Sequence, residues 1–433
     1  MTLKRDHITV FEHQAIKLNQ VIDGVKFDIS RLKALRDYFG EKGVPFFSLT
    51  NNGVRFNEYV GVIQVGNTLF EVLPKADKNP SAKKWRNILI DMLRAVGSFD
   101  IKTPSHSNLK VKPNTVLDLY FELFIKEVEY LFHNGLVKQY RKKEGNVTAL
   151  KGSLQFAQHL QQNLTHQERF YVRHTTYDVE HKLHFILFKT LRLLKQINTN
   201  AALNSRIGNL LLNFPEMPEI KVSENTFDKL VLNRKTQSYT KAIEISRLIL
   251  LQYHPDLSKG RNHVLALMFD MNKLWEQFVF VSLRKNKHPD MTVTAQTSRY
   301  FWQPTNGSRS AIRPDVVVNK DTDSCVVLDT KWKNLNGYNP SPDDLRQMYV
   351  YHEYYGAKRV ALVYPGNPKN GSTGNFYPSK FYDKMDKECS ILLLEVPEKG
   401  EGGNSIVKTW QTTIRTQFTD WWNLPSKNID YNL

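Results

Sequence analysis

Two short apolar runs that carry charged residues constrain this chain most. The first run begins at Asp315, directly after Arg313-Pro314, and the second ends in Asp329-Thr330-Lys331. Alternate residues on a strand point to the same face of a sheet, so Asp329 and Lys331 project together. If the two runs pair as a hairpin, Asp315 comes beside them. Two carboxylates and an ammonium group at one sheet edge can bind a hard divalent cation and orient a water molecule or a phosphate oxygen.

Each of these residues also has an ordinary interpretation. Asp315 and Asp329 can be strand-end aspartates that face solvent, and Asp329 with Lys331 can be a surface ion pair that contributes little to stability. A lone Asp-x-Lys is a weak signal, and the Pro-Asp upstream strengthens it only moderately. The hypothesis of a site therefore needs residues from other elements.

Two predicted helices supply such residues. Glu276 lies beside an apolar stripe, where a carboxylate is costly to bury unless it is paired or binds a metal, although most helical glutamates face solvent. Gln347 and Tyr351 are four residues apart and share one helix face, where they can bind a phosphate or orient a nucleophile. An ordinary amphipathic helix would look the same. In this order along the chain, however, the pieces together favour a site.

Length and charge set the broad class of the protein. The chain has 433 residues, which favours two or three domains. Its formal net charge is +17, which favours association with a polyanion such as a nucleic acid. A basic protein without any nucleic-acid role would have the same charge balance, so charge leaves both interpretations open.

Cysteine usage and hydropathy exclude several classes. The two cysteines, Cys325 and Cys389, form no Cys-x-x-Cys or Cys/His cluster, so we expect neither a zinc site nor an oxidising compartment. The N-terminus lacks an apolar signal core, and no run of about 18 apolar residues exists. We therefore expect a cytoplasmic protein that does not span a membrane.

The pattern of apolar residues predicts three regions. We expect a β-rich subdomain at 1–80, a helical region at 81–257 and an α/β domain at 258–433. Within the helical region, the basic segment 138–172 is either a projecting hairpin or a solvated connector. Expected helices are 83–96, 115–135, 178–197, 238–253, 266–285 and 341–356, and expected strands are 46–50, 62–65, 68–73, 291–303, 312–318, 324–333, 359–364, 391–396 and 405–408.

The ordered motifs Glu, Pro-Asp, Asp-x-Lys and Gln-x-x-x-Tyr resemble the PD-(D/E)xK nuclease superfamily, in the branch with a Gln-x-x-x-Tyr helix. The chain is more similar still to the McrC family, the nuclease subunits of McrBC modification-dependent restriction systems. The matching stretches are Leu267–Glu276, Arg313–Asp315, Leu328–Lys333, Asp344–Tyr351 and Val363–Pro365, with looser likeness at Leu73–Lys75, Leu150–Leu154 and Tyr177–Leu183. The resemblance implies an α/β PD-(D/E)xK nuclease domain at the C-terminus, after a β-rich and then a helical region.

The resemblance also implies an activity, a Mg²⁺-dependent hydrolysis of DNA phosphodiester bonds in defence against foreign DNA, with Mn²⁺ as an alternative metal. The metal ligands would be Asp315, Asp329, Glu276 and the backbone carbonyl of Thr330. Lys331 would position the attacking water and stabilise negative charge on the phosphate. Gln347 and Tyr351 would support the site or contact the DNA backbone.

The chain lacks a phosphate-binding loop of its own. The nearest imitation of Gly-x-x-x-x-Gly-Lys-[Ser/Thr] runs from Gly366 to Thr373 and has Ser372 in place of the lysine. NTP hydrolysis would therefore come from another subunit, which the resemblance identifies as a McrB-like AAA+ GTPase ring that recognises methylated or otherwise modified DNA. The N-terminal half would dock on this ring and stimulate it, with segment 138–172 as a candidate for the docking projection.

Two other functions remain open at this point. One is a stand-alone repair or recombination nuclease of the same superfamily. The other is a DNA-binding adaptor whose nuclease-like domain is inert. The presence of Asp315, Asp329 and Lys331 together argues against an inert domain.

Overall fold

The computed structural model describes residues 6–65, 68–76, 81–96, 116–198, 200–254, 264–285, 291–335, 337, 339–377, 387–401 and 404–423. These residues fall into two compact units. The helical unit is the described part of 101–267, and the two-segment unit joins 5–100 to 268–433. The three expected regions have different bounds, because the first stretch of chain packs in one unit with the last. The expected boundary at 257/258 lies outside the described residues.

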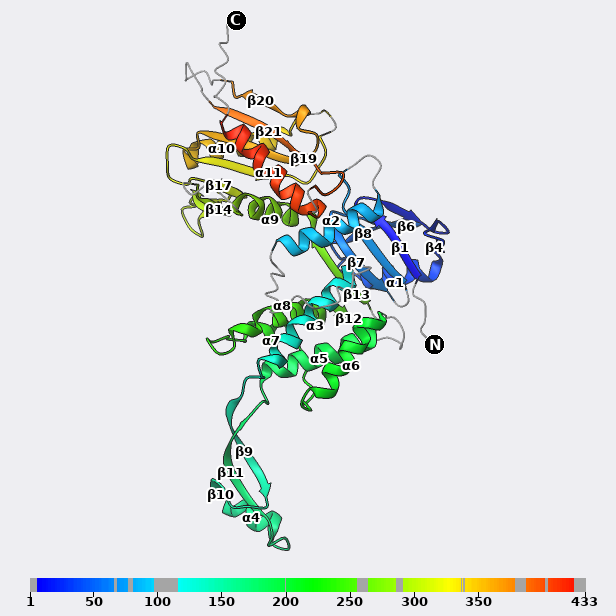
Figure 1. Cartoon of the computed structure of the whole chain (residues 1–433), viewed down its shortest axis with the longest axis vertical. Coiled ribbons are helices and arrows are strands. Elements are labelled where there is room, and N and C mark those ends of the chain that lie inside the picture. Colours follow the sequence, from blue (N-terminus) through cyan, green and yellow to red (C-terminus); the bar gives the residue numbers. More distant parts are fainter. Residues whose placement is uncertain are drawn as a thin grey trace, which may run out of the picture. The chain divides into compact units, whose positions relative to one another are not determined.

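The helical unit consists mainly of helices with one long β-hairpin (Figure 1). Its helices are α3 (Val116–His133), α4 (Phe156–Asn163), α5 (Lys182–Ile197), α6 (Ala201–Asn213), α7 (Glu224–Asp228) and α8 (Thr240–Gln252), with a 3-10 turn at Gln237–Tyr239. Its strands are β9 (Gln139–Val147), β10 (Ser153–Leu154), β11 (Phe170–Asp178) and β12 (Tyr253–His254), while β13 (Val264–Asp270) begins here and ends in the other unit. Apolar residues at helical spacing, such as Leu183, Ile186 and Leu187 on α5, form the core of the unit.

The basic segment forms a projecting hairpin, which we call the arm (residues 139–178). Strands β9 and β11 pair antiparallel from Gln139 opposite Asp178 to Val147 opposite Phe170. None of the nine residues of β9 is buried, and Figure 1 shows the hairpin extending away from α5 and α6, with the short helix α4 at its tip. Of the two alternatives for this segment, the hairpin is therefore correct.

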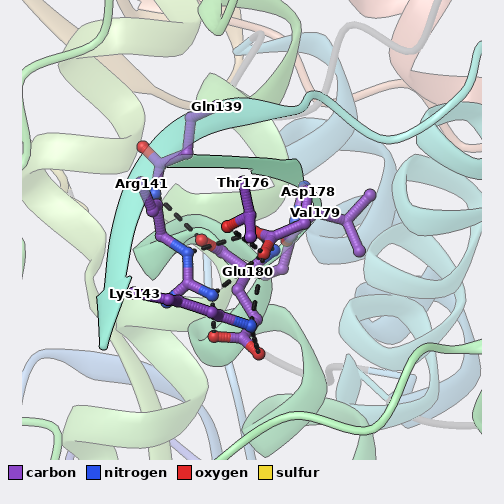
Figure 2. Close-up of polar contacts among 8 residues, drawn as sticks. Gln139, Arg141, Lys143, Thr176, Asp178, Val179 and Glu180 are labelled. Atoms are coloured by element: carbon purple, nitrogen blue, oxygen red, sulfur yellow. Dashed lines mark hydrogen bonds and ion pairs between the residues drawn. The ribbon is translucent and has the colours of Figure 1, made fainter. Parts of the chain in front are cut away.

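A network of ion pairs fixes the base of the arm (Figure 2). The guanidinium of Arg141 donates to both carboxylate oxygens of Asp178, at 3.1 and 3.0 Å, and also pairs with Glu180. These contacts hold the pKa of Asp178 well below its usual range. Lys143 lies 3.4 Å from Asp178 and 3.3 Å from Glu180. The Tyr177–Leu183 stretch thus joins the arm to α5, at whose N-terminus His181 accepts a hydrogen bond from the backbone N–H of Leu183.

A glycine allows the tip of the arm to pack closely. Gly152 has φ of 74°, and an added Cβ would lie 2.3 Å from the carbonyl oxygen of Arg173. Only glycine fits such a position without a shift of the backbone. This requirement explains the glycine in the Leu150–Leu154 stretch, where β10 pairs with β11.

The first stretch of the two-segment unit is rich in short strands. They are β1 (Asp6–Phe11), β2 (Ala15–Lys17), β3 (Val21–Ile22), β4 (Val25–Lys26), β5 (Phe47–Thr50), β6 (Gly53–Phe56), β7 (Tyr59–Val65) and β8 (Thr68–Leu73), with helices α1 (Ile29–Phe39) and α2 (Ala82–Ala95). Strand β8 pairs parallel with β1 and antiparallel with β7. The parallel pairing of β8 with β1 is one that short-range turn signals do not predict.

The second stretch forms a six-stranded mixed sheet in the order β14-β17-β18-β19-β21-β20. Its strands are β14 (Val293–Ala295), β17 (Val316–Val318), β18 (Val326–Thr330), β19 (Arg359–Pro365), β20 (Ser372–Asn375) and β21 (Glu388–Leu394), and a separate hairpin pairs β15 (Arg299–Trp302) with β16 (Ser310–Ile312). A 3-10 turn at Pro368–Asn370 precedes β20. The mixed α/β character expected for this part of the chain is confirmed.

Three helices cover this sheet. They are α9 (Met271–Arg284), α10 (Pro342–Tyr355) and α11 (Ile406–Asn423). Helix α10 packs Met348 and Tyr351 against Val327 and Leu362 of the central strands. Helix α9 also contacts β18, so it covers the opposite face, where α11 lies against it (Figure 1). The central strands β17, β18 and β19 are buried at every residue, whereas the edge strands β14 and β20 are largely exposed.

Several expected elements differ from the structure in type or bounds. The strand expected at 405–408 is the start of α11, whose buried Trp410, Ile414 and Phe418 recur every four residues, a helical spacing. The helix expected at 266–285 begins only at Met271, because Asp270 ends β13 and accepts the N-cap hydrogen bonds of Asn272 and Lys273. The strand expected at 291–303 is broken into β14 and β15. Among the described residues, no helix has both the length and the apolar character that crossing a bilayer requires.

Candidate active site

The two apolar runs of the sequence pair as an antiparallel hairpin. Val316 lies opposite Leu328 and Val318 opposite Val326, and one further step along this register puts Asp315 opposite Asp329. The carboxylate of Asp315 is held in place, because its Oδ2 accepts hydrogen bonds from the backbone N–H and the hydroxyl of Thr330, both at 2.7 Å. Asp329 is only 2% exposed. The two aspartates are thus fixed side by side at the end of the central strands.

Lys331 extends from the same strand end toward these carboxylates. Its Nζ lies 2.7 Å from Oδ2 of Asp329 and 3.7 Å from Oδ1 of Asp344, which is in the first turn of α10. Its backbone N–H donates to the carbonyl of Val363 at 2.9 Å, which ties the residue to β19. Burial by itself would lower the pKa of Lys331, but the attraction of Asp329 and the other carboxylates outweighs it and raises that pKa.

The carboxyl groups of the site are hard to ionise. Burial and the charge of Asp315 raise the pKa of Asp329 to about 6, against the opposing attraction of Lys331. Burial also raises the pKa of Asp315, although the hydrogen bonds from Thr330 oppose the shift. A buried carboxyl group whose pKa a neighbouring carboxylate raises would be stabilised in its ionised form by a cation, so the electrostatics of the site favour one.

Glu276 reaches the site from α9 and is half-buried. Its Oε1 accepts a hydrogen bond from Nε2 of Gln296 at 2.6 Å. The pKa of Glu276 is raised, first by burial and then by the charge of Asp315. Glu276 is thus partly shielded from solvent and hydrogen-bonded to Gln296.

Gln296 is a residue of the site that the sequence did not reveal. It has φ of 47°, a left-handed conformation that is uncommon for a side chain larger than glycine. In this conformation its backbone N–H donates to the carbonyl of Asp315 at 3.1 Å, while its side chain contacts Glu276. Gln296 thus links the helix carboxylate to the strand carboxylate. Its position in an expected strand concealed it.

The Gln-x-x-x-Tyr motif connects Lys331 to the strand before Asp315. Oε1 of Gln347 lies 3.5 Å from Nζ of Lys331, and its Nε2 donates to the hydroxyl of Tyr351 at 2.7 Å. That hydroxyl in turn donates to the carbonyl of Arg313 at 3.2 Å. The two side chains are buried or half-buried, so this arrangement favours support of the site over direct contact with a ligand.

Asp344 is a second residue that the sequence analysis did not single out. Its Oδ2 accepts from Lys333 at 2.8 Å, and its Oδ1 faces Lys331. Burial opposes ionisation of this carboxyl, but hydrogen bonds from Lys333 and Ser341 outweigh burial and lower its pKa. Its place in the first turn of α10, three residues before Gln347, was the available signal.

The donor atoms of the site suit a magnesium ion only partly. Among the described residues, no three His, Cys, Asp or Glu side chains lie close enough together to form a complete metal site. Mg²⁺ usually keeps several water ligands and needs only one or two carboxylates from the protein. The paired carboxylates of Asp315 and Asp329 meet that need, whereas the carboxylate of Glu276 is hydrogen-bonded to Gln296.

The buried carboxyl group of Glu12, in the first stretch of the chain, supports the strand end that carries Lys331. Oε1 of Glu12 accepts hydrogen bonds from the indole N–H of Trp332, at 2.7 Å, and from the backbone N–H of Lys75, at 2.6 Å. Burial raises the pKa of Glu12 to about 7. Trp332 directly follows Lys331, so this contact joins the Leu73–Lys75 stretch to the Leu328–Lys333 stretch.

Comparison with known proteins identifies the family. The family model of the McrBC 5-methylcytosine restriction system component matches residues 54–365. No curated protein matches the chain in sequence.

Two solved structures from Thermococcus gammatolerans are similar. One is a refined half-complex from a tetradecameric assembly of McrB AAA+ hexamers with bound McrC. A chain of it is 20% identical with a TM-score of 0.67, over 96% of this chain and 100% of that chain. The other is a cryo-EM structure of the McrBC complex, with 21% identity and a TM-score of 0.48 over 65% of this chain and 88% of that chain. The first shows a shared fold over nearly the whole chain. Since the family model spans well over half of the sequence, the chain belongs to the McrBC 5-methylcytosine restriction system component family.

Proposed function

We propose that this chain is the McrC-type nuclease subunit of a McrBC-like restriction system, with a PD-(D/E)xK domain that hydrolyses DNA phosphodiester bonds. One observation carries the proposal. In a member of the McrBC family, Asp315 lies opposite Asp329 with the ammonium of Lys331 2.7 Å from the second carboxylate. This is the pair of acids and the cation that metal-dependent phosphodiester hydrolysis needs.

In this proposal the strand-end residues divide the work. Asp315 and Asp329 would hold Mg²⁺ or Mn²⁺, together with the backbone carbonyl of Thr330, and Glu276 would contribute from α9. The ion, when bound, supplies Lewis-acid stabilisation of the charge on the phosphate and lowers the pKa of an attacking water. Thr330 holds Asp315 in position through its backbone N–H and hydroxyl. Lys331 donates to the phosphate or the attacking water from the protein side.

The α10 side chains position these groups. Gln347 contacts Lys331, and Tyr351 holds the carbonyl of Arg313 two residues before Asp315. A shift of α10 would therefore move the lysine and the first aspartate together. We assign Gln347 and Tyr351 a positioning role, with contact to the DNA backbone as the alternative.

The energy source lies on another chain in this proposal. This chain has no phosphate-binding loop, and the similar structure from Thermococcus gammatolerans contains McrB AAA+ hexamers with bound McrC. We infer that a McrB-like AAA+ GTPase ring recognises modified DNA and delivers it to this nuclease, which stimulates the ring. The arm, which carries Arg141, Lys142 and Lys143, is the candidate docking element. Its exposed strands and fixed base suit a projection that inserts into a partner.

Plasmid cleavage tests the proposal. Methylated and unmethylated plasmids are incubated with Mg²⁺, with and without the AAA+ partner and GTP. We expect cleavage of the methylated plasmid only in the complete mixture. Efficient cleavage by the lone chain would contradict the division of labour between nuclease and motor.

Two aspartates of one hairpin provide a matched pair of variants. Asp329→Ala removes a buried carboxylate of the site, whereas Asp323→Ala changes an exposed aspartate in the turn between the same two strands. We expect the first variant to lose cleavage and the second to cut as the unaltered protein does. If Asp329→Ala cuts normally, the assignment of the site is wrong.

A further inference from the structure

The β15–β16 hairpin carries the most exposed aromatic cluster near the site. We call residues 298–313 the aromatic hairpin. Tyr300, Phe301 and Trp302 are 68%, 45% and 58% exposed on β15. The strand register shifts between Tyr300 and Trp302, as at a β-bulge, so their side chains do not alternate regularly between the two faces of the hairpin. Large aromatic side chains exposed in a row usually mark a binding surface.

The aromatic hairpin carries only positive charges, although Arg299 is paired with Asp321 outside it. Residues 298–313 contain three arginines and no acidic residue. The guanidinium of Arg309 lies 5.1 Å from the ring centroid of Tyr300, and Arg313 is exposed at the end of the hairpin. A nucleic-acid strand with unpaired bases has negative phosphates and flat apolar base faces. Arginines that alternate with exposed aromatic rings complement both of these features.

The base of the aromatic hairpin is anchored to α10. The hydroxyl of Tyr355 donates to the carbonyls of Thr297 and Ile312, at the two ends of the hairpin. Arg299 donates to the carbonyl of Tyr354 at 2.7 Å, and the ring of Phe301 packs edge-on against that of Tyr354 with centroids 5.2 Å apart. Because these contacts already fix the hairpin, little conformational entropy is lost when its aromatic rings bind a ligand.

The aromatic hairpin also continues directly into the candidate site. Arg313 ends the hairpin and lies two residues before Asp315, and its carbonyl accepts from Tyr351. A DNA strand whose phosphate lies at the two aspartates therefore passes this surface. The continuity and the charge together select DNA over a protein partner.

We infer that the aromatic hairpin binds unpaired bases of the DNA strand beside the cleaved phosphate, with Tyr300 and Trp302 stacking on bases and Arg309 contacting the backbone. This inference rests on the proposed nuclease function, since DNA is its ligand. It adds a base-stacking surface that is separate from the metal ligands.

Binding without cleavage tests the inference. The full chain, in EDTA, is titrated against a fluorescein-labelled oligo(dT) strand and a duplex of the same length, and anisotropy gives Kd over a series of salt concentrations. We expect Tyr300→Leu and Trp302→Leu each to weaken single-strand binding at least about fivefold, since a stacked base contributes about 1–3 kcal/mol. The salt dependence should stay unchanged in these variants, because they remove no charge.

Three further variants separate stacking from charge and from folding. Trp302→Phe keeps an aromatic ring and should restore most of the affinity. Arg309→Gln should reduce the slope of log Kd against log salt by about 0.7, as expected for one lost contact to a single strand. Tyr130→Leu, at an exposed tyrosine of α3, is the control and should bind as the unaltered chain does. Urea unfolding checks that each variant is folded.

A base analogue gives a direct signature of stacking. A strand with 2-aminopurine should lose fluorescence on binding to the unaltered chain and keep it with Trp302→Leu. Equal affinity of Trp302→Leu and the unaltered chain would overturn the inference. The inference would also be overturned if the variants changed only the oligomeric mass of the protein, measured by light scattering. That result would make the surface a contact between copies of this chain. If stacking is found but the complete system never cuts DNA, the nuclease proposal fails while this inference holds.

Discussion

Replacing Glu12 with glutamine tests how the first stretch of chain supports the candidate site. The carboxyl of Glu12 is 3% exposed, and burial raises its pKa from 4.5 to about 7. In the native state it therefore keeps its proton over a range where the unfolded chain has lost it. The native state binds more protons than the unfolded state between about pH 4.5 and 7, so the stability contributed by this group falls as pH rises through that window.

The size of the effect follows from the two pKa values. Between pH 5 and pH 8 the contribution of Glu12 to the free energy of unfolding should fall by about 2.5 kcal/mol. Glu12→Gln keeps an oxygen that can accept from Trp332 and Lys75 but cannot ionise. It also buries an amide donor, at a cost of about 1–3 kcal/mol that does not depend on pH. The difference in stability between the two proteins should therefore change with pH by about 2.5 kcal/mol.

Tryptophan fluorescence is a selective assay for this prediction. All seven tryptophans lie in the two-segment unit, so their emission reports the unfolding of that unit alone. Urea unfolding of both proteins at pH 5, 6, 7 and 8 gives the difference at each pH. Glu41→Gln, at an exposed glutamate, is the control. A difference that stays constant from pH 5 to pH 8 would refute the reasoning.

Three further predictions concern the site and the arm. Mn²⁺ binding, measured by calorimetry, should weaken below about pH 6 by about tenfold per pH unit, because protons compete for Asp329; binding independent of pH would contradict a role of this carboxyl as ligand. Tyr351→Phe removes the hydrogen bonds to Gln347 and to the carbonyl of Arg313, so kcat for cleavage should fall about tenfold with KM for DNA unchanged. The control variant Tyr349→Phe should have little effect on either constant. A change in KM alone would indicate that Tyr351 contacts DNA instead. Gly152→Ala should disturb the arm, raising its cleavage in limited proteolysis and reducing stimulation of the partner GTPase, whereas Gly208→Ala on α6 should do neither; an unchanged arm would show that the close approach to Arg173 is relieved without cost.

The strand and helix periods predicted much of the C-terminal architecture. Asp315 comes beside Asp329 once the two apolar runs pair as a hairpin, and the four-residue spacing of Gln347 and Tyr351 puts both on one helix face. These relations are local, and local patterns suffice for them. The resemblance to a nuclease family supplied the order in which the pieces belong together.

What the sequence did not reveal depends on distant contacts or on unusual backbone conformation. Gln296 acts through a left-handed φ, which a β-rich composition does not predict. Glu12 and Trp332 meet across 320 positions of the chain, a pairing that no local pattern encodes. Helix α11 was missed because its opening residues are β-branched, although the spacing of Trp410, Ile414 and Phe418 carried the correct signal.

The division of one compact unit between two separated stretches of chain has a consequence for synthesis. Residues 5–100 leave the ribosome first, but their packing partners begin at residue 268. At a translation rate of about 5–20 residues per second, the first stretch waits on the order of ten seconds or more for the second. Glu12 cannot support the strand end that carries Lys331 until that strand has been made. The candidate site is therefore completed late in translation, after the arm and the rest of the helical unit have had time to fold.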